Sequence, residues 1–251
     1  MAGHSKWANI KRKKAGVDAA RNKIFNKLVK EISVAAREGG GEPEHNPRLA
    51  MAIENAKSQN MPKDNIQRAI KKGTGELEGG SSYEELTYEG YGPGGIAYFV
   101  ECTTDNQNRT VGEIRSAFTK FGGKLGQNGS VDYMFDQKGL IKIKAEGVDQ
   151  EQLMLEAIDA GAEDIKEEED HLEVYTVRED LMPVRAKLEE FGYQIASAEL
   201  VRIPQTLTKV DEDTALSNFK LMELLEDNDD VSNVFTNMQM DEETLAVAEN
   251  M

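Results

Sequence analysis

The hydrophobic period of the chain changes at one Gly/Ser/Glu-rich stretch, residues 73–82. Before this stretch, apolar residues recur every three or four positions, the spacing of amphipathic helices. After it, short β-rich runs alternate with helical segments. A chain of 251 residues with such a break is expected to fold as several small domains rather than around one large core. We therefore interpret residues 73–82 as a linker between a helical part and a mixed part.

Three helices are predicted before the linker. The first covers residues 17–37 and stops at three consecutive glycines. The second opens at Asn46-Pro47, an N-cap followed by a proline in the first turn. The third follows Pro62 and ends in two lysines and a glycine at 71–73. One apolar face on each helix predicts a small bundle, whose second and third helices are joined as closely as in a helix-turn-helix motif.

The mixed part contains two sets of elements. The first set is strands 85–91 and 96–103 joined by a turn at 92–95, a helix at 108–121 and a strand at 131–135. The second set has the strand–helix–strand–strand–helix–strand order of a ferredoxin-like fold, at 140–144, 149–160, 163–167, 172–177, 181–191 and 195–202. A last helix at 214–226 and strand at 231–237 have too little core to stand alone, so we expect them to complete the first set.

The predicted fold class is therefore multi-domain α and α+β. An N-terminal helical bundle is followed by two α+β (ferredoxin-like) domains, one inserted in the other. The predicted limits are 1–78 for the basic arm, bundle and linker, 79–137 plus 205–251 for a discontinuous domain, and 138–204 for the inserted βαββαβ domain.

The net charge, like the hydrophobic pattern, differs between the helical part and the mixed part of the chain. The whole chain has a formal net charge of −16, which would ordinarily argue against a polyanionic partner. Residues 1–72 nevertheless carry +9 and residues 73–251 carry −25. Such asymmetry indicates a nucleic-acid or membrane partner for the basic part, with a merely solvated basic surface as the alternative. No apolar run approaches 18 residues, so a membrane span is not expected.

The basic residues cluster at the chain's start and on helix faces, which favours contact with phosphates. Trp7, the only tryptophan, lies among five cations in residues 4–14. It is expected either to stack on an unpaired base or to anchor the arm on its own bundle. The predicted nucleic-acid-binding residues are His4, Lys6, Trp7, Lys11, Arg12, Lys13, Lys14, Lys23, Lys27, Lys30, Arg48, Lys63, Arg68, Lys71 and Lys72.

Motifs for catalysis and for cofactors are missing from the sequence. Residues 90–95 match G-x-G-x-x-G but precede a strand, so a hairpin turn is favoured over a dinucleotide site, and close approach to RNA or a partner stays open. The histidines lack metal-ligand spacing, and residues 227–230 lack the glycine and glutamate of a calcium loop. We expect no catalytic residue, metal, cofactor or small-molecule substrate. The single cysteine, Cys102, fits a reducing cytoplasm.

Several blocks of sequence resemble one known family. They are the opening MAGHSKWANIK, then NPRL at 46–49, YEGYGPGG at 88–95, DNQNRT at 105–110, FGGKLG at 121–126 and GSV at 129–131. The chain is similar in these blocks to the YebC family, with its mitochondrial translational-activator relatives. The resemblance implies three domains, a cytoplasmic location, no enzymatic activity and DNA-binding transcriptional regulation. It assigns the family's basic N-terminal residues to Lys6, Lys11, Arg12, Lys13 and Lys14.

The function predicted from the sequence is a non-enzymatic, nucleic-acid-binding regulator of gene expression, a YebC-type transcriptional regulator on duplex DNA. One alternative is a ribosome-associated translation factor that binds ribosomal RNA and eases synthesis through proline-rich or slow stretches. A third hypothesis is a protein-binding adaptor that uses the acidic domains alone.

Overall fold

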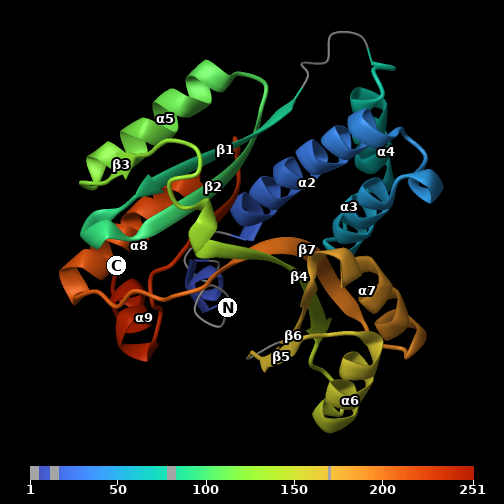
Figure 1. Ribbon diagram of the computed structural model, residues 1–251. Coiled ribbons are helices and arrows are strands. Elements are labelled where there is room, and N and C mark those ends of the chain that lie inside the picture. Colours follow the sequence, from blue (N-terminus) through green and yellow to red (C-terminus); the bar gives the residue numbers. More distant parts are fainter. Residues whose placement is uncertain (1–5, 12–16, 78–82, 169–170) are drawn as a thin grey trace.

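The computed structural model describes residues 6–11, 17–77, 83–168 and 171–251 (Figure 1). The predicted N-terminal helices are present as α2 (Val17–Gly39), α3 (Pro47–Ser58) and α4 (Lys63–Gly73). Their apolar faces meet in one core, which includes Ile32, Leu49 and Ile66. The side chain of Asn46 caps α3 at the amide of Leu49, 3.0 Å away, and donates to the carbonyl of Ala35 at 2.7 Å. The cap predicted from Asn46-Pro47 therefore also ties α3 to α2.

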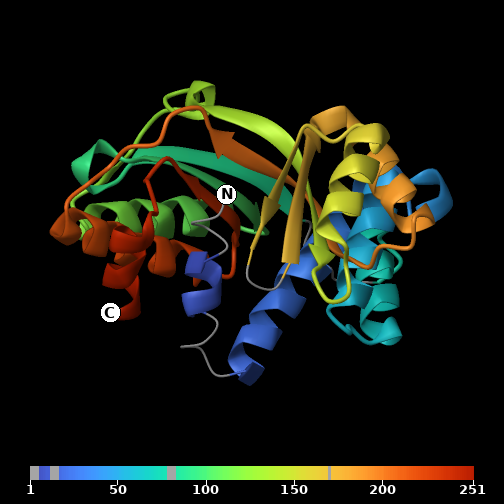
Figure 2. The ribbon, with the colours of Figure 1, turned by 90° about the horizontal axis from the view of Figure 1, so that it is seen from below.

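A first antiparallel sheet has the strand order β3-β1-β2-β8. Its strands are β1 (Glu84–Tyr91), β2 (Ala97–Thr104), β3 (Lys124–Leu125) and β8 (Val231–Thr236). Helices α5 (Gln107–Lys120), α8 (Glu212–Glu226) and α9 (Glu242–Glu249) lie on one side of it (Figure 2). Tyr98, Phe118 and Phe219 fill the core between sheet and helices.

A second antiparallel sheet has the strand order β5-β6-β4-β7. It consists of β4 (Phe135–Lys144), β5 (Asp164–Glu167), β6 (His171–Val177) and β7 (Ile195–Pro204), with helices α6 (Gln150–Ala160) and α7 (Leu181–Glu190). The chain order is the predicted strand–helix–strand–strand–helix–strand. The domain limits predicted from the sequence, including the insertion of residues 138–204, stay a prediction.

The two sheets and the bundle contact one another directly. Phe135 at the start of β4 packs with Phe99 and Phe235 on the face of the first sheet opposite α5 and α8. The Asn55 side chain of α3 donates to the carbonyl of Ala198 in β7 at 2.9 Å and accepts from its amide at 3.2 Å. The bundle is thus fastened to an edge strand of the second sheet. No described helix is both long and apolar enough to cross a membrane.

The strand predicted at 131–135 is wrong. Residues Asp132–Met134 form a turn of 3-10 helix, and Phe135 instead begins β4, five residues before the predicted start of that strand at 140. The cause is the buried carboxylate of Glu89, which accepts hydrogen bonds from the amides of Gly129 at 2.6 Å, Val131 at 2.7 Å and Asp132 at 2.9 Å. These amides are therefore unavailable to a sheet. Among the described residues, the helical residues 6–11, β3 and α9 were not predicted.

The glycine-rich motif is the β1–β2 turn, as the hairpin interpretation predicts. Residues 84–91 pair in register with residues 97–104, and the Gly92 amide donates to the carbonyl of Ile96 at 2.8 Å. Gly94 and Gly95 have φ of 70° and 76°, a left-handed backbone that disfavours other residues.

Replacing Glu89 with glutamine is expected to destabilise the protein by about 2–3 kcal/mol, because the neutral amide loses the charge that strengthens three hydrogen bonds and turns one acceptor atom into a donor. Urea unfolding followed by circular dichroism measures the loss. Glu146→Gln, at an exposed turn position, is the control for the change in charge and should leave the midpoint nearly unchanged. Equal midpoints for the Glu89 variant and the unaltered protein would contradict this role of Glu89.

Candidate nucleic-acid interface

The predicted phosphate-binding lysines of α2 contact another part of the same chain. These lysines lie at i, i+4 and i+7, on one side of the helix: Lys23, Lys27 and Lys30. This side packs against residues 226–230, where α8 ends and β8 begins, a segment we call the acidic turn. Lys23 Nζ lies 2.8 Å from Asp227 Oδ1, and Lys27 Nζ donates to the carbonyl of Ser232 at 3.2 Å. Burial lowers the pKa of Lys27.

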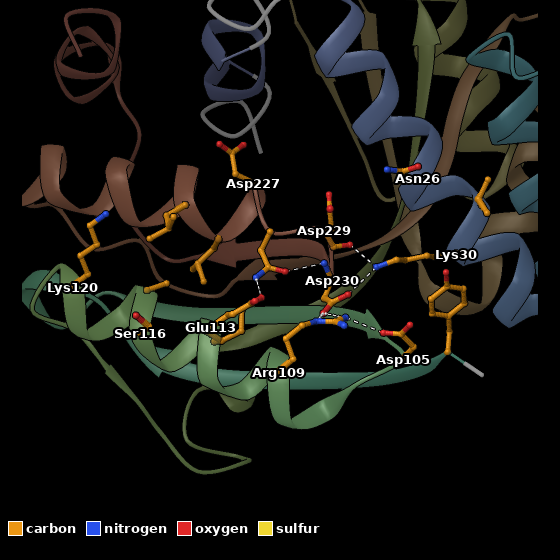
Figure 3. A pocket seen from close by; sticks show the side chains of 17 residues that line it. Asn26, Lys30, Asp105, Arg109, Glu113, Ser116, Lys120, Asp227, Asp229 and Asp230 are labelled. Atoms are coloured by element: carbon orange, nitrogen blue, oxygen red, sulfur yellow. Dashed lines mark hydrogen bonds and ion pairs between the residues drawn. The ribbon is translucent and has the colours of Figure 1, made fainter. Parts of the chain in front are cut away.

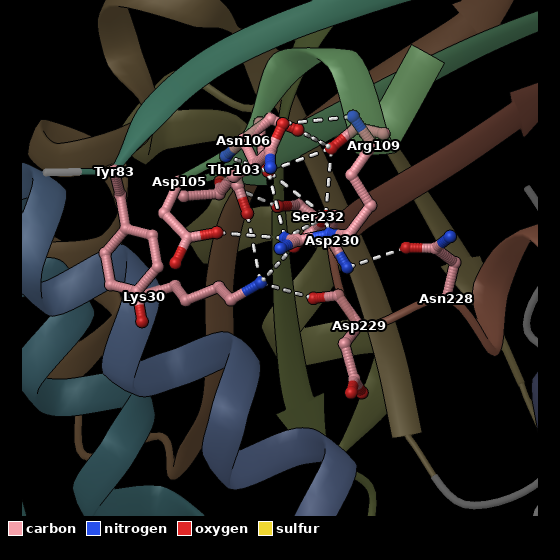
Figure 4. Close-up of polar contacts among 12 residues, drawn as sticks. Lys30, Tyr83, Thr103, Asp105, Asn106, Arg109, Asn228, Asp229, Asp230 and Ser232 are labelled. Atoms are coloured by element: carbon pink, nitrogen blue, oxygen red, sulfur yellow. Dashed lines mark hydrogen bonds and ion pairs between the residues drawn. The ribbon is translucent and has the colours of Figure 1, made fainter. Parts of the chain in front are cut away.

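Lys30 reaches the most buried group of the acidic turn, the carboxylate of Asp230 (Figure 4). Lys30 Nζ lies 3.0 Å from Asp230 Oδ1 and also donates to the carbonyls of Asp229 at 2.6 Å and Thr103 at 3.1 Å. From α5, Arg109 Nη2 lies 2.6 Å from Asp230 Oδ2. Burial would raise the pKa of Asp230, but hydrogen bonds from Arg109 and Lys30 outweigh it and lower the pKa to about 2. Asp230 is therefore ionised and joins α2 to α5 and β8.

Trp7 packs on the first sheet's helices rather than on its own bundle. Its ring stacks on Phe219 of α8, with 4.9 Å between centroids, and only 3% of the residue is exposed. Trp7 Nε1 donates to Glu226 Oε1 at 3.3 Å, and Lys11 Nζ lies 2.9 Å from Glu226 Oε2 and 3.0 Å from Asp227 Oδ1. In this arrangement the Trp7 ring has no face open to a base, and Lys11 is neutralised within the chain.

Two more predicted residues hold parts of the fold together. Arg48 forms ion pairs with Glu31, Glu38 and Glu85, which link α3 to α2 and β1. Lys72 Nζ donates to the hydroxyl of Tyr83 at 2.8 Å and lies 4.1 Å from the centroid of its ring. Both cations have partners inside the protein.

The exposed side of α4 presents three predicted residues to solvent: Lys63, Arg68 and Lys71. None of them has an acidic partner within the part of the chain that the structure describes. Lys6 is half-buried beside Glu242 and Glu249 of α9. The remaining predicted residues lie outside the described residues: His4, Arg12, Lys13 and Lys14.

A cleft of about 970 Å³ opens beside the acidic turn, between α2 and α5 (Figure 3). Three cations line it, but they are outnumbered by the carboxylates Asp105, Glu113, Asp227, Asp229 and Asp230. The cleft itself is therefore unsuited to a phosphate. Within residues 6–11, 17–77, 83–168 and 171–251, no His, Cys, Asp and Glu side chains form a group that could hold a metal ion.

Sequence reasoning missed the acidic turn, which it considered only as a calcium loop, and it missed Arg109. The available signal was charge complementarity: the acids at residues 226–230 belong to the part with net charge −25, and the lysines of α2 belong to the part with +9. Nothing local in the sequence shows that these segments, about 200 residues apart, are in contact.

The fold and its charges define a class of protein in which a cationic helical part is joined to an acidic part with two antiparallel sheets. Two family models match it: "TACO1/YebC protein N-terminal domain" at residues 5–76 and "TACO1/YebC second and third domain" at residues 83–238. The chain therefore belongs to the TACO1/YebC family, which confirms the resemblance seen in the sequence.

Similar proteins cover nearly the whole chain. A probable transcriptional regulatory protein of Geobacter sulfurreducens is 55% identical over 98% of both chains, and one of Persephonella marina is 53% identical over 98% of both. The crystal structure of a conserved hypothetical protein from Aquifex aeolicus superposes with a TM-score of 0.85 at 50% identity. It covers 90% of this chain and 93% of that one.

Replacing Asp230 with asparagine is expected to lower the free energy of unfolding by about 2–4 kcal/mol, because Lys30 and Arg109 lose their buried counter-ion. The stability contributed by this carboxylate is fully present above its unfolded pKa near 4 and is lost as the pH falls toward 2. Urea unfolding of both proteins between pH 7 and pH 2 should therefore give curves that converge in acid. Asp229→Asn, at the exposed neighbouring position, is the control, and an equally large loss in that variant would contradict the role of Asp230.

Proposed function

We propose that this protein is a non-enzymatic regulator of transcription that binds duplex DNA in the cytoplasm through its helical bundle. The observation that carries the proposal is the exposed basic side of α4, with Lys63, Arg68 and Lys71 free of acidic partners among the described residues. The relatives from Geobacter sulfurreducens and Persephonella marina, named as probable transcriptional regulatory proteins, support the regulatory role.

The chemistry of α4 suits both affinity and some choice of sequence. Lysine and arginine neutralise phosphates and release counter-ions, which gives affinity without sequence preference. Asn65 and Gln67 are exposed on the same helix. Amide side chains of this kind can pair with the edge of adenine in a major groove. The arm residues His4, Arg12, Lys13 and Lys14 belong to the same proposed interface.

The acidic part has a complementary role in the proposal. Residues 73–251 carry −25 and repel phosphate. They orient the protein so that only the bundle approaches DNA, and they keep nonspecific binding weak. The domain limits 1–78, 79–137 plus 205–251, and 138–204 are part of the same proposal.

The test is a variant with Lys63→Gln, Arg68→Gln and Lys71→Gln, titrated against labelled duplex DNA over a series of salt concentrations. We expect its Kd at low salt to rise about tenfold or more, and the slope of log K against log salt to fall by about 2–3, since each phosphate contact contributes about 0.9. The control carries the same change of charge outside the bundle, with Lys138→Gln, Lys166→Gln and Lys209→Gln.

Promoter fragments, random duplexes and structured RNA are titrated in parallel. Equal loss of affinity in both triple variants would remove α4 from the interface. Equal affinity of the unaltered protein for random DNA and every promoter would count against transcriptional regulation. A clear preference for structured RNA over duplex DNA would replace DNA with RNA as the target.

A further inference from the structure

Four lysines donate hydrogen bonds to one short stretch of the chain, residues 226–232: Lys11, Lys23, Lys27 and Lys30. Lys30 donates in addition to the carbonyl of the neighbouring Thr103. These lysines come from two separate helices, residues 6–11 and α2, and they converge on the end of α8. One ion pair between α2 and α8 would use a single lysine, whereas several lysines converge here.

The carboxylate of Asp227 lies where two ammonium groups meet. Its Oδ1 atom is 3.0 Å from Lys11 Nζ and 2.8 Å from Lys23 Nζ. Lys27, one turn further along α2, adds a third positive charge close by. Its pKa is lowered mainly by burial and in addition by the charges of Lys11 and Lys23. Ammonium groups this close repel one another, and the carboxylate oxygen between Lys11 and Lys23 offsets that repulsion. The geometry is that of an oxyanion site, filled here by a side chain of the same protein.

We propose that Lys11, Lys23 and Lys27 form a phosphate-binding site for nucleic acid, and that Glu226 and Asp227 occupy it as an internal substitute until a phosphate group displaces them. This inference rests on the proposed function, because it assigns to the same polyanionic ligand a second surface that is closed in this structure. The acidic turn then sets the affinity of the protein for nucleic acid.

The contacts divide into outer ones, at Glu226 and Asp227, and an inner group at Asp230. The side chains of Lys11 and Glu226 are 21% and 24% exposed. The side chains of Lys23 and Asp227 are 44% and 41% exposed, so water and salt reach their ion pair and weaken it. The side chains of Lys30 and Asp230 are only 14% and 6% exposed, and Asp230 also forms an ion pair with Arg109. A phosphate can therefore replace Asp227 while Lys30 and Asp230 keep α2 attached to the sheet.

Phosphate is the ligand that this site fits best. It offers several charged oxygens to ammonium groups that approach from different helices, whereas a carboxylate offers two. A nucleic-acid strand also supplies further phosphates to the remaining cations of the arm and bundle.

The test is a variant with Glu226→Gln and Asp227→Asn, in the full chain, titrated with a labelled random-sequence duplex over a series of salt concentrations. We expect binding at low salt to tighten about fivefold or more, and the slope of log K against log salt to steepen by about 1–2, because the freed lysines gain phosphate contacts. The matched control carries Glu212→Gln and Asp213→Asn, two exposed acids at the other end of α8.

A third variant adds Lys23→Gln to the Glu226 and Asp227 changes. If the gain comes from freed lysines, this addition should cancel most of it, whereas a gain from reduced negative charge alone should largely persist. Urea unfolding midpoints of all three variants show whether each is folded under the titration conditions.

The outcomes separate this inference from the proposed function. A gain that is confined to the Glu226 and Asp227 variant and is cancelled by Lys23→Gln supports the closed site. Equal affinities in that variant and its matched control, with binding by the unaltered protein intact, overturn the closed site and leave the proposed function standing. If neither the unaltered protein nor any variant binds duplex DNA at low salt, the proposed function is wrong, and the inference is wrong with it.

Discussion

The buried carboxylate of Asp230 is the interaction on which the arrangement of the helices around the first sheet depends. It receives Lys30 from α2, Arg109 from α5 and the hydroxyl groups of Thr104 and Thr110. An ionised group removed from water is costly unless cations and hydrogen bonds surround it. Since α2 and β8 come from distant parts of the sequence, this anion joins the bundle to a sheet that is completed almost 200 residues later.

The same contact divides the basic residues of the protein into two groups with different roles. Lys11, Lys23 and Lys30 balance the charge of the acidic turn. Arg48 does so for three glutamates around α3. The basic residues on α4 balance no charge within the described residues. A positive residue is therefore informative about binding only after its internal partners are known, because a clustered charge pattern does not separate lysines that are paired inside the protein from those that face solvent.

The helices and most strands could be predicted because their determinants are local. Asn46-Pro47 starts α3, Gly94 and Gly95 form the hairpin turn, and apolar periodicity marks the faces that pack. The errors arise where a side chain from a distant part of the sequence determines the local structure. Glu89 takes the amides of a segment that otherwise resembles a strand, and Phe219 provides the surface on which Trp7 stacks. For the candidate interface, the sequence supplied the residue types, but the partner of each lysine depends on tertiary contacts that no local pattern encodes.

The position of β8 has a consequence for the order of events during synthesis. β2 pairs with β1, which directly precedes it in the chain, but the neighbour at its other edge, residues 231–236, is synthesised about 130 residues later. During that interval the edge of β2 is open to pairing with another chain, and the surface on which Trp7 rests does not yet exist. The helix at residues 6–11 is thus synthesised about 200 residues before the surface of α8 on which it packs.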